Sequence, residues 1–348
     1  MKRFLLSVCF TIIIVQVFAT EKPDFTVKKI WSGAPHNAFT DLIRYNNKFY
    51  CTFREASGHV PGVNGTDGKI RILESKDGEV WQSLALLEKK GYDLRDSKLS
   101  ITPKGKLMVV MGGSNYDGND LINRLPHISF FDKKKNRFTD PVPLKIDKRV
   151  RSDYDWLWRV TWNYSEKVGY GVMYQKKDNS GTSLQLMKTK DGKKYGHVVT
   201  LDVTNLPSEG SVIFTNEGEM LILQRCDQKG NNHGLIGRSH PPYQDWVWID
   251  AGVHLGGPNM IPLTNGMFVA GSRSFDCDNK SGTSLFLYNT KNNKFSKIID
   301  LPSGGDTSYP GMLIYHNQLW FSYYSSHEGK AEIYLAKINL DTIKSFIR

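Results

Sequence analysis

The chain has 348 residues, of which 23% are charged and 39% hydrophobic, a composition that excludes a disordered chain, a collagen and a coiled coil. With 46 lysines and arginines against 35 aspartates and glutamates, the net charge is +11, and an acidic partner is one explanation for this excess. Aromatic residues make up 12% of the chain and glycines number 31, which with recurrent turn pairs favours an all-β fold.

The first 19 residues have the pattern of a secretory signal peptide. Lys2 and Arg3 precede an apolar run from Phe4 to Ala19, which ends in small residues that suit signal peptidase. The run is too short to be a comfortable membrane anchor. We therefore expect residues 1–19 to be removed and the protein to be secreted or periplasmic, with no integral membrane association.

The cysteines of an exported chain would meet an oxidising compartment. Cys51, Cys226 and Cys277 follow the signal segment, and an odd number cannot all pair. No two of them have the spacing of metal ligands. We expect no metal and no cofactor.

One hairpin motif recurs six times and sets the predicted architecture. Each copy has a short apolar strand, a tight polar turn and a second apolar strand. The turns are centred on Asn47, Gly105, Lys167, Gly218, Gly266 and Asn317. Steps of 48 to 62 residues between them are close to the length of a four-stranded propeller blade. We predict an all-β, six-bladed β-propeller with four antiparallel strands in each blade.

A polar turn follows the third strand of two units. It is clear from Ser75 to Trp81 and weaker from Thr189 to Tyr195. Its Asp can bond the turn backbone, its Gly supplies a positive φ and its aromatic residue packs between sheets. We interpret the string as scaffold. It resembles the Asp-box, or bacterial neuraminidase repeat, of secreted propellers.

The two ends of the chain are predicted to interlock. A ring of blades exposes an open edge unless it is closed, and Phe25 to Trp31 can complete the blade that ends near Ile333 to Ile338. Residues 20–348 would then form a single domain. The tail from Leu340 to Ile347 alone has a helical pattern.

Equivalent positions in the repeat gather charged residues at one end of the predicted channel. Seven residues past the turns lie Arg54, Gly112, Tyr174, Arg225, Arg273 and Tyr324. Three arginines placed alike could form an anion clamp, or each could pair with a neighbouring acid. Eight or nine residues before the turns lie Asp96, Trp158 with Arg159, Glu209 and Tyr309. Polar groups at such positions are costly to enclose, which indicates a site.

These segments resemble the sialidase superfamily over nearly all of the mature chain. Ser208 to Val212, with Gly218 to Arg225, is similar to the segment that carries the catalytic glutamate and a carboxylate-binding arginine. Thr307 to Leu313 is similar to the segment of the nucleophilic tyrosine, and Asp93 to Leu99 to one whose aspartate contacts substrate. Arg273 lies near where a further arginine is expected.

The resemblance implies Tyr309 as nucleophile and Glu209 as its base. A carboxylate nucleophile would be repelled by the acid group of a sialic acid, whereas a neutral tyrosine would not. The general acid should come shortly before the first Asp-box, which makes Asp67 the best candidate. Glu55, Asp41 and His36 are further candidates for this role.

One departure from the family concerns the first blade. Sialidases begin it with an Arg-Ile-Pro string, whereas this chain has His36 to Leu42 and lacks the arginine. Arg54 or Arg159 could substitute for it. The change favours an acidic sugar that is related to sialic acid but distinct from it.

We therefore expect a monomeric, exo-acting glycoside hydrolase that releases a terminal acidic sugar from a glycan with retention. Substrate contacts are expected from Arg54, Asp96, Arg159, Arg225 and Arg273. One alternative is a polysaccharide lyase, with His36, His327 and Tyr309 as acid and base. Another is a glycan-binding propeller without catalysis. Nucleic acid is not an expected partner of an exported protein.

Overall fold

The computed structural model describes residues 25–62, 68–177, 181–264, 266–275 and 278–347. The predicted signal peptide, Asp67 and Cys277 lie outside the described residues. Cys51 and Cys226 are buried free thiols. No helix among the described residues has the length and apolar character needed to span a membrane.

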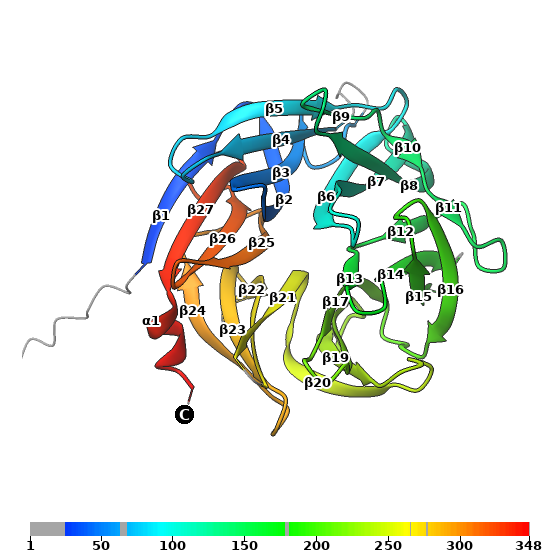
Figure 1. Ribbon diagram of the computed structural model, residues 1–348, viewed down its shortest axis with the longest axis vertical. Coiled ribbons are helices and arrows are strands. Elements are labelled where there is room, and N and C mark those ends of the chain that lie inside the picture. Colours follow the sequence, from blue (N-terminus) through cyan, green and yellow to red (C-terminus); the bar gives the residue numbers. More distant parts are fainter. Residues whose placement is uncertain (1–24, 63–67, 178–180, 265, 276–277, 348) are drawn as a thin grey trace, which may run out of the picture.

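The described strands form six sheets arranged as blades around one axis, as predicted (Figure 1). Blade 1 contains β2 (His36–Tyr45), β3 (Lys48–Ala56), β4 (Lys69–Ser75) and β5 (Gln82–Leu87). Blade 2 contains β6 (Asp93–Ile101), β7 (Leu107–Asp117), β8 (Asp120–Asp132), β9 (Arg137–Phe138) and β10 (Val142–Pro143). Blade 3 contains β12 (Asp155–Leu157), β13 (Thr161–Asn163), β14 (Val168–Lys177), β15 (Gly181–Thr189), β16 (Lys194–Leu201) and β11 (Lys145–Ile146), which runs parallel to β16.

The other three blades have four strands each. Blade 4 contains β17 (Pro207–Phe214), β18 (Met220–Cys226), β19 (His233–Ser239) and β20 (Val247–His254). Blade 5 contains β21 (Gly256–Thr264), β22 (Met267–Phe275), β23 (Ser281–Asn289) and β24 (Lys294–Leu301). Blade 6 contains β25 (Thr307–Tyr315), β26 (Gln318–Ser325), β27 (Glu332–Asn339) and β1 (Phe25–Trp31).

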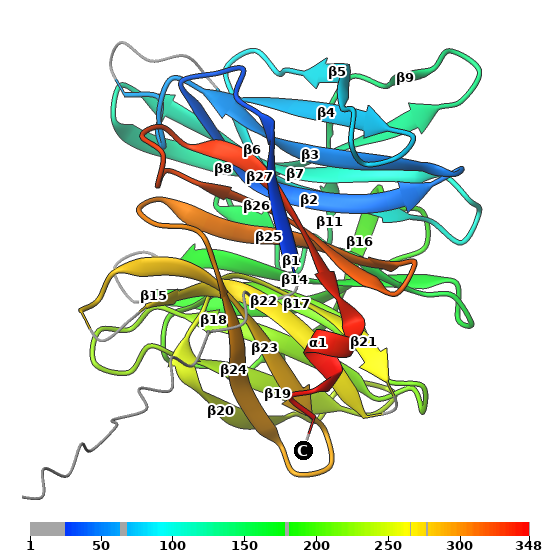
Figure 2. The same cartoon turned by 90° about the vertical axis from the view of Figure 1, so that its left-hand side faces the viewer.

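The ring closes by the predicted interlock of the two ends. β1 pairs antiparallel with β27, from Phe25 opposite Ile338 to Trp31 opposite Ile333; the two strands lie side by side in Figure 1 and face the viewer in Figure 2. The short helix α1 (Leu340–Lys344) follows β27, and Asn339 caps it. Blade 6 thus takes its outermost strand, β1, from the start of the described chain and its other three strands from the end, which links the two ends of the ring.

Each sheet buries side chains on both faces because neighbouring blades pack against it. In β7, Val109 and Met111 join a core cluster with blade 1, whereas Met108 and Val110 join one with blade 3. Successive side chains of a strand point to opposite faces, so a strand covered on both faces is apolar throughout.

The predicted turns have the chemistry that the sequence indicated. The turns between first and second strands contain residues with positive φ, such as Asn47 at 60° and Gly105 at 68°. In the turn after β4, Asp77 accepts hydrogen bonds from the backbone of Glu79 and Val80, and Gly78 has a φ of 75°. These contacts are structural, as interpreted from the sequence.

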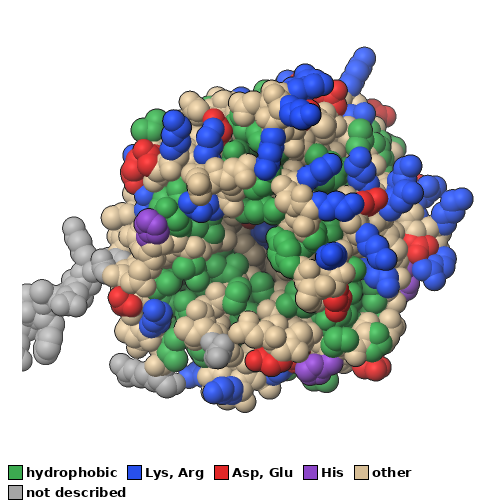
Figure 3. Space-filling view, viewed as in Figure 1, with side chains coloured by type: hydrophobic (Ala, Val, Ile, Leu, Met, Phe, Trp, Pro, Cys, Tyr) green, Lys and Arg blue, Asp and Glu red, His purple; other side chains and the backbone are tan. Residues whose placement is uncertain are grey.

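The surface seen along the ring axis has a hollow at its centre (Figure 3). Lysine and arginine side chains gather on one part of the rim, over β9 to β11 and β16. There Lys145 and Lys194 lie opposite each other in the parallel pair of β11 and β16. Part of the charge excess is thus on the outer surface, away from the axis.

Candidate active site

An irregularity shared by the inner strands builds the candidate site. The pairing of the first with the second strand shifts register between Ala38 and Asp41 in blade 1 and at equivalent places in blades 2, 4, 5 and 6. Such bulges redirect side chains. The residues within the bulges that face the site are Phe39, Asp96, Glu209, Gly257 and Tyr309.

Four of these five residues have a left-handed backbone. The φ angles of Phe39, Asp96, Gly257 and Tyr309 are 65°, 54°, 60° and 54°. Non-glycine residues rarely adopt this conformation, and where they do so together a functional constraint is a common reason. The sequence analysis did not name Phe39 and Gly257 as site residues, although they precede their turns by the same eight or nine residues as the others.

Tyr309 and Glu209 form the centre of the site. The Tyr309 hydroxyl donates to Glu209 Oε1 at 2.6 Å, and Arg225 Nη1 donates both to Glu209 Oε2 and to Tyr309 Oη at 3.0 Å. The backbone N–H of Gly257 donates to Glu209 Oε2 at 2.7 Å. The sequence predicted these two side chains and Arg225, and the structure brings all three together.

Aromatic rings enclose Tyr309. The ring of Phe39 lies 4.9 Å from it between centroids, that of Trp158 5.5 Å and that of Tyr324 6.0 Å. Burial raises the pKa of the Tyr309 phenol well above its usual value, and the charge of Glu209 raises it further. The free hydroxyl therefore keeps its proton, and only a base that takes this proton would make it a nucleophile.

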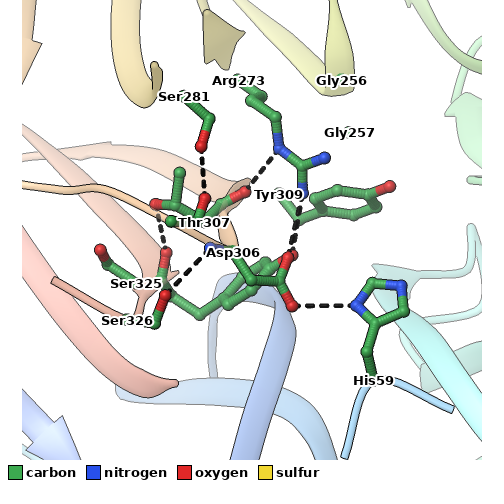
Figure 4. Close-up of polar contacts among 12 residues, drawn as sticks. His59, Gly256, Gly257, Arg273, Ser281, Asp306, Thr307, Tyr309, Ser325 and Ser326 are labelled. Carbon is green, nitrogen blue, oxygen red and sulfur yellow. Dashed lines mark hydrogen bonds and ion pairs between the residues drawn. The ribbon is translucent and has the colours of Figure 1, made fainter. Parts of the chain in front are cut away.

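Arg273 approaches the same tyrosine from blade 5. Its guanidinium carbon lies 5.4 Å from the Tyr309 ring centroid, its Nε donates to the Thr307 carbonyl at 3.0 Å, and its Nη2 donates to Tyr324 Oη at 3.0 Å (Figure 4). Arg225 and Arg273 retain 20% and 18% exposure of their side chains. Both guanidinium groups are therefore accessible to an anionic ligand without a rearrangement of the core.

The structure buries Arg54, one of the three arginines of the predicted clamp, and leaves little exposure to Arg159, a further predicted substrate contact. Arg54 is fully buried, and its Nε and Nη2 both donate to Asp93 Oδ1, at 2.9 and 2.7 Å. Burial lowers its pKa. Arg159 donates from Nη1 to both oxygens of Asp41 at 3.0 Å. The alternative given in the sequence analysis, an acid beside each clamp arginine, holds for all three positions, because Arg225 also pairs with Glu209 and Asp227, and Arg273 with Asp306.

Asp96 is a buried carboxyl beside the centre. Its Oδ1 has no hydrogen-bond partner among the described residues. Burial raises its pKa to about 6, while Lys98 opposes and Glu209 adds to the shift. Lys98, which the sequence analysis did not single out, is itself buried with its Nζ 4.6 Å from the Trp158 ring centroid. Burial lowers the pKa of Lys98 to about 8.

The candidates for a general acid are not brought to one place. Asp67 lies outside the described residues. Glu55 accepts from Trp31 Nε1 at 2.6 Å and from Arg71 at 2.8 Å. Asp41 accepts from Arg159 and from the backbone of Leu99. His36 contacts Asp306, with 2.9 Å between Nε2 and Oδ2.

Replacing Asp96 by asparagine should make the protein more stable above neutral pH. Because the folded-state pKa is raised to about 6, the bound proton stabilises the fold below about pH 4, and this contribution is lost as the pH rises through 6. A shift of roughly 2 units corresponds to about 3 kcal/mol. Asp96→Asn should therefore unfold at higher urea than the wild type at pH 7.5, with the difference vanishing near pH 4. If the stabilities of the two proteins changed with pH in parallel, Asp96 would not titrate between pH 4 and 7.5.

Gly257 is required by the position of Tyr309. A Cβ at Gly257 would lie 2.4 Å from Tyr309 Cγ, whereas one at Gly252, whose φ is also positive, would meet nothing within 4 Å. Both alanine variants carry backbone strain of about 1 to 2 kcal/mol. Gly257→Ala should cost about 1 to 3 kcal/mol more than Gly252→Ala in urea unfolding, because Tyr309 must move. Equal losses of stability in the two variants would mean that the Tyr309 ring moves aside without cost.

No family model and no curated protein matches the chain. Among solved structures, a protein of unknown function from Dyadobacter fermentans is similar over 91% of this chain and 100% of its own, with 16% identity and a TM-score of 0.76. The Trypanosoma rangeli sialidase is similar over 90% of this chain, with 13% identity and a TM-score of 0.69, and this chain spans 57% of its length.

A Penicillium chrysogenum α-L-arabinanase, solved with arabinobiose, is similar over 91% of this chain and 98% of its own. Its identity is 16% and its TM-score 0.67. Identities this low establish the fold and leave the site to be argued from its residues. The chain has the six-bladed propeller fold that sialidases and arabinanases of the glycoside hydrolase class share.

Proposed function

We propose that this protein is a retaining, exo-acting glycoside hydrolase that releases a terminal acidic sugar and acts as a secreted or periplasmic monomer. The observation that carries the proposal is the hydrogen bond of 2.6 Å from the buried Tyr309 hydroxyl to Glu209, with Arg225 donating to both. The propeller fold, which includes a sialidase and an arabinanase among its members, supports the same class of reaction.

In the proposed reaction the Tyr309 oxygen bonds to the anomeric carbon as the bond to the leaving-group oxygen breaks. Glu209 accepts the phenolic proton, and a general acid protonates the leaving oxygen. Asp67 remains our candidate for that acid. A water molecule then gives a proton to the deprotonated general acid and attacks the same carbon as its bond to the Tyr309 oxygen breaks. Glu209 returns the proton to Tyr309, and the sugar leaves with its configuration retained.

Arg225, Arg273 and Asp96 are the proposed substrate contacts. The two partly exposed guanidinium groups can bind a carboxylate by paired hydrogen bonds. All four arginines pair with acids, but Arg54 is fully buried and the Arg159 side chain is only 11% exposed, so both are less accessible to a substrate than Arg225 and Arg273. The Phe39 ring stands in the stretch where sialidases carry their first arginine, which favours an acidic sugar that is related to sialic acid but distinct from it.

The test is incubation with a panel of sialylated, uronate-rich, sulfated and arabinose-containing oligosaccharides. The proposal expects one terminal monosaccharide to be released, and its anomeric configuration, followed by NMR, to be retained at early times. A product that absorbs in the ultraviolet would indicate elimination by a lyase instead. Saturable binding without any product would indicate a glycan-binding propeller.

A further inference from the structure

A second group of side chains lies beside the Tyr309 centre and is not used by the proposed reaction. His36 begins β2, His59 lies in the loop after β3, and Asp306 precedes β25. Asp306 Oδ2 is 2.9 Å from His36 Nε2 and 2.9 Å from His59 Nδ1. The three ligand-type atoms all lie within 4.8 Å of one another. Two imidazoles and one carboxylate therefore converge on a common point.

This spacing is close to that of a metal site. Zinc binds nitrogen and oxygen ligands at about 2.0 to 2.2 Å in a tetrahedron, which places neighbouring ligand atoms about 3.4 Å apart. Asp306 Oδ2 lies 2.9 Å from each of the two imidazole nitrogens, so the ligand atoms need to move apart only slightly to reach this spacing. The His59 side chain can make this movement, because it is 54% exposed and lies in a loop.

The carboxylate is fixed in the orientation that a ligand requires. Tyr324 Oη donates to Asp306 Oδ1 at 2.6 Å, and Arg273 Nη2 lies 3.3 Å from the same atom. Figure 4 shows Asp306 held in this way with its other oxygen toward His59. Second-shell hydrogen bonds of this kind orient ligating carboxylates in metal proteins.

The two imidazoles differ in their burial and in the contacts that hold them. His36 is buried, and its Nδ1 has no hydrogen-bond partner among the described residues. Metal-bound histidines usually donate from their second nitrogen, and loss of that contact typically weakens binding by about 10- to 100-fold. We therefore expect moderate affinity. The Phe39 ring packs edge-on against His59 at 5.4 Å and walls one side of the cluster.

We propose that His36, His59 and Asp306 bind one divalent cation of the borderline class, such as Zn²⁺, Co²⁺ or Ni²⁺. Imidazole nitrogen suits these ions, whereas Ca²⁺ and Mg²⁺ prefer sites made of oxygen. Three protein ligands leave a fourth position open in a tetrahedral site. This differs from the sequence-based expectation of no metal, because residues 36, 59 and 306 have no ligand spacing along the chain. The proposal goes beyond the hydrolase proposal and does not depend on it.

The experiment is calorimetric titration of the full chain, prepared without a histidine tag and stripped of metal, with Zn²⁺. We expect one Zn²⁺ per chain and a Kd in the micromolar range. Co²⁺ should give the intense visible absorbance of tetrahedral coordination. His59→Ala, at a half-exposed side chain, should keep the fold and weaken binding at least 10-fold.

His233→Ala is the matched control. His233 also contacts an aspartate, with 3.1 Å between Nδ1 and Asp250 Oδ2, but no second imidazole is part of that pair. Its removal should leave the high-affinity step unchanged. The proposal is overturned if the wild type shows no saturable binding at one ion per chain, or if His59→Ala binds as tightly as the wild type.

Discussion

Tyr309→Phe should lower kcat/KM by about 10⁴-fold or more on the glycan that the wild type cleaves, because loss of a nucleophile leaves only binding and electrostatic effects. The variant removes the oxygen that donates to Glu209 at 2.6 Å and leaves the ring contacts in place. It should therefore fold normally. Initial rates at several substrate concentrations, together with circular dichroism, measure both results.

Tyr323→Phe is the control for this prediction. Tyr323 is also buried, and its hydroxyl donates to the carbonyl of Pro302 at 2.9 Å and not to Glu209. Its removal should change the rate little and cost about 1 kcal/mol of stability. If Tyr309→Phe kept most of the wild-type rate, or if both variants lost the same activity, the nucleophile would have been assigned wrongly.

Glu209→Gln should lower kcat by about 10² to 10⁴-fold, the range that a positioned general base contributes. The amide has nearly the same shape as the carboxylate, but it cannot take the Tyr309 proton and no longer neutralises Arg225. Since the Tyr309 pKa stands well above its usual value, the phenol would remain protonated throughout the reaction. Steady-state rates and single-turnover detection of a glycosyl-enzyme would report the loss of the first step.

Glu219→Gln provides a matched comparison. Glu219 accepts from Arg238 Nε and Nη2 at 2.8 Å each, in a partly buried pair that lies elsewhere in blade 4. The same chemical change there should lower stability and leave kcat unaltered. A Glu209→Gln variant that behaved like Glu219→Gln would show that Glu209 is a structural partner of Arg225 alone.

Much of the site was visible in the sequence because the repeat aligns it. Counting back from each turn singled out Asp96, Glu209 and Tyr309, and the bulges of the inner strands bring these residues together. The same count applied to the first and fifth blades yields Phe39 and Gly257. An apolar residue and a glycine carry no chemical signal, so their part in holding Tyr309 emerged only from the structure.

The burial and the acid partners of the arginines could not be predicted by counting from the turns. Arg54, Arg225 and Arg273 occupy equivalent positions in the repeat, yet only Arg54 is fully buried. Each guanidinium meets different acids: Asp93 of the neighbouring blade accepts two hydrogen bonds from Arg54, Glu209 and Asp227 accept from Arg225, and Asp306 accepts from Arg273. Which acid reaches which guanidinium depends on packing between blades.

The sequence by itself determined the number of blades, their turns and the closure of the ring, because these follow from local periodicity, turn chemistry and the pairing of two apolar strands. Only the tertiary structure decided which groups meet at the axis. Tyr309 and Glu209 are 100 residues apart, and His36 and Asp306 are 270 residues apart. Contacts over such separations form only once six blades have packed into a ring, since each blade alone exposes the side chains that its neighbours complete.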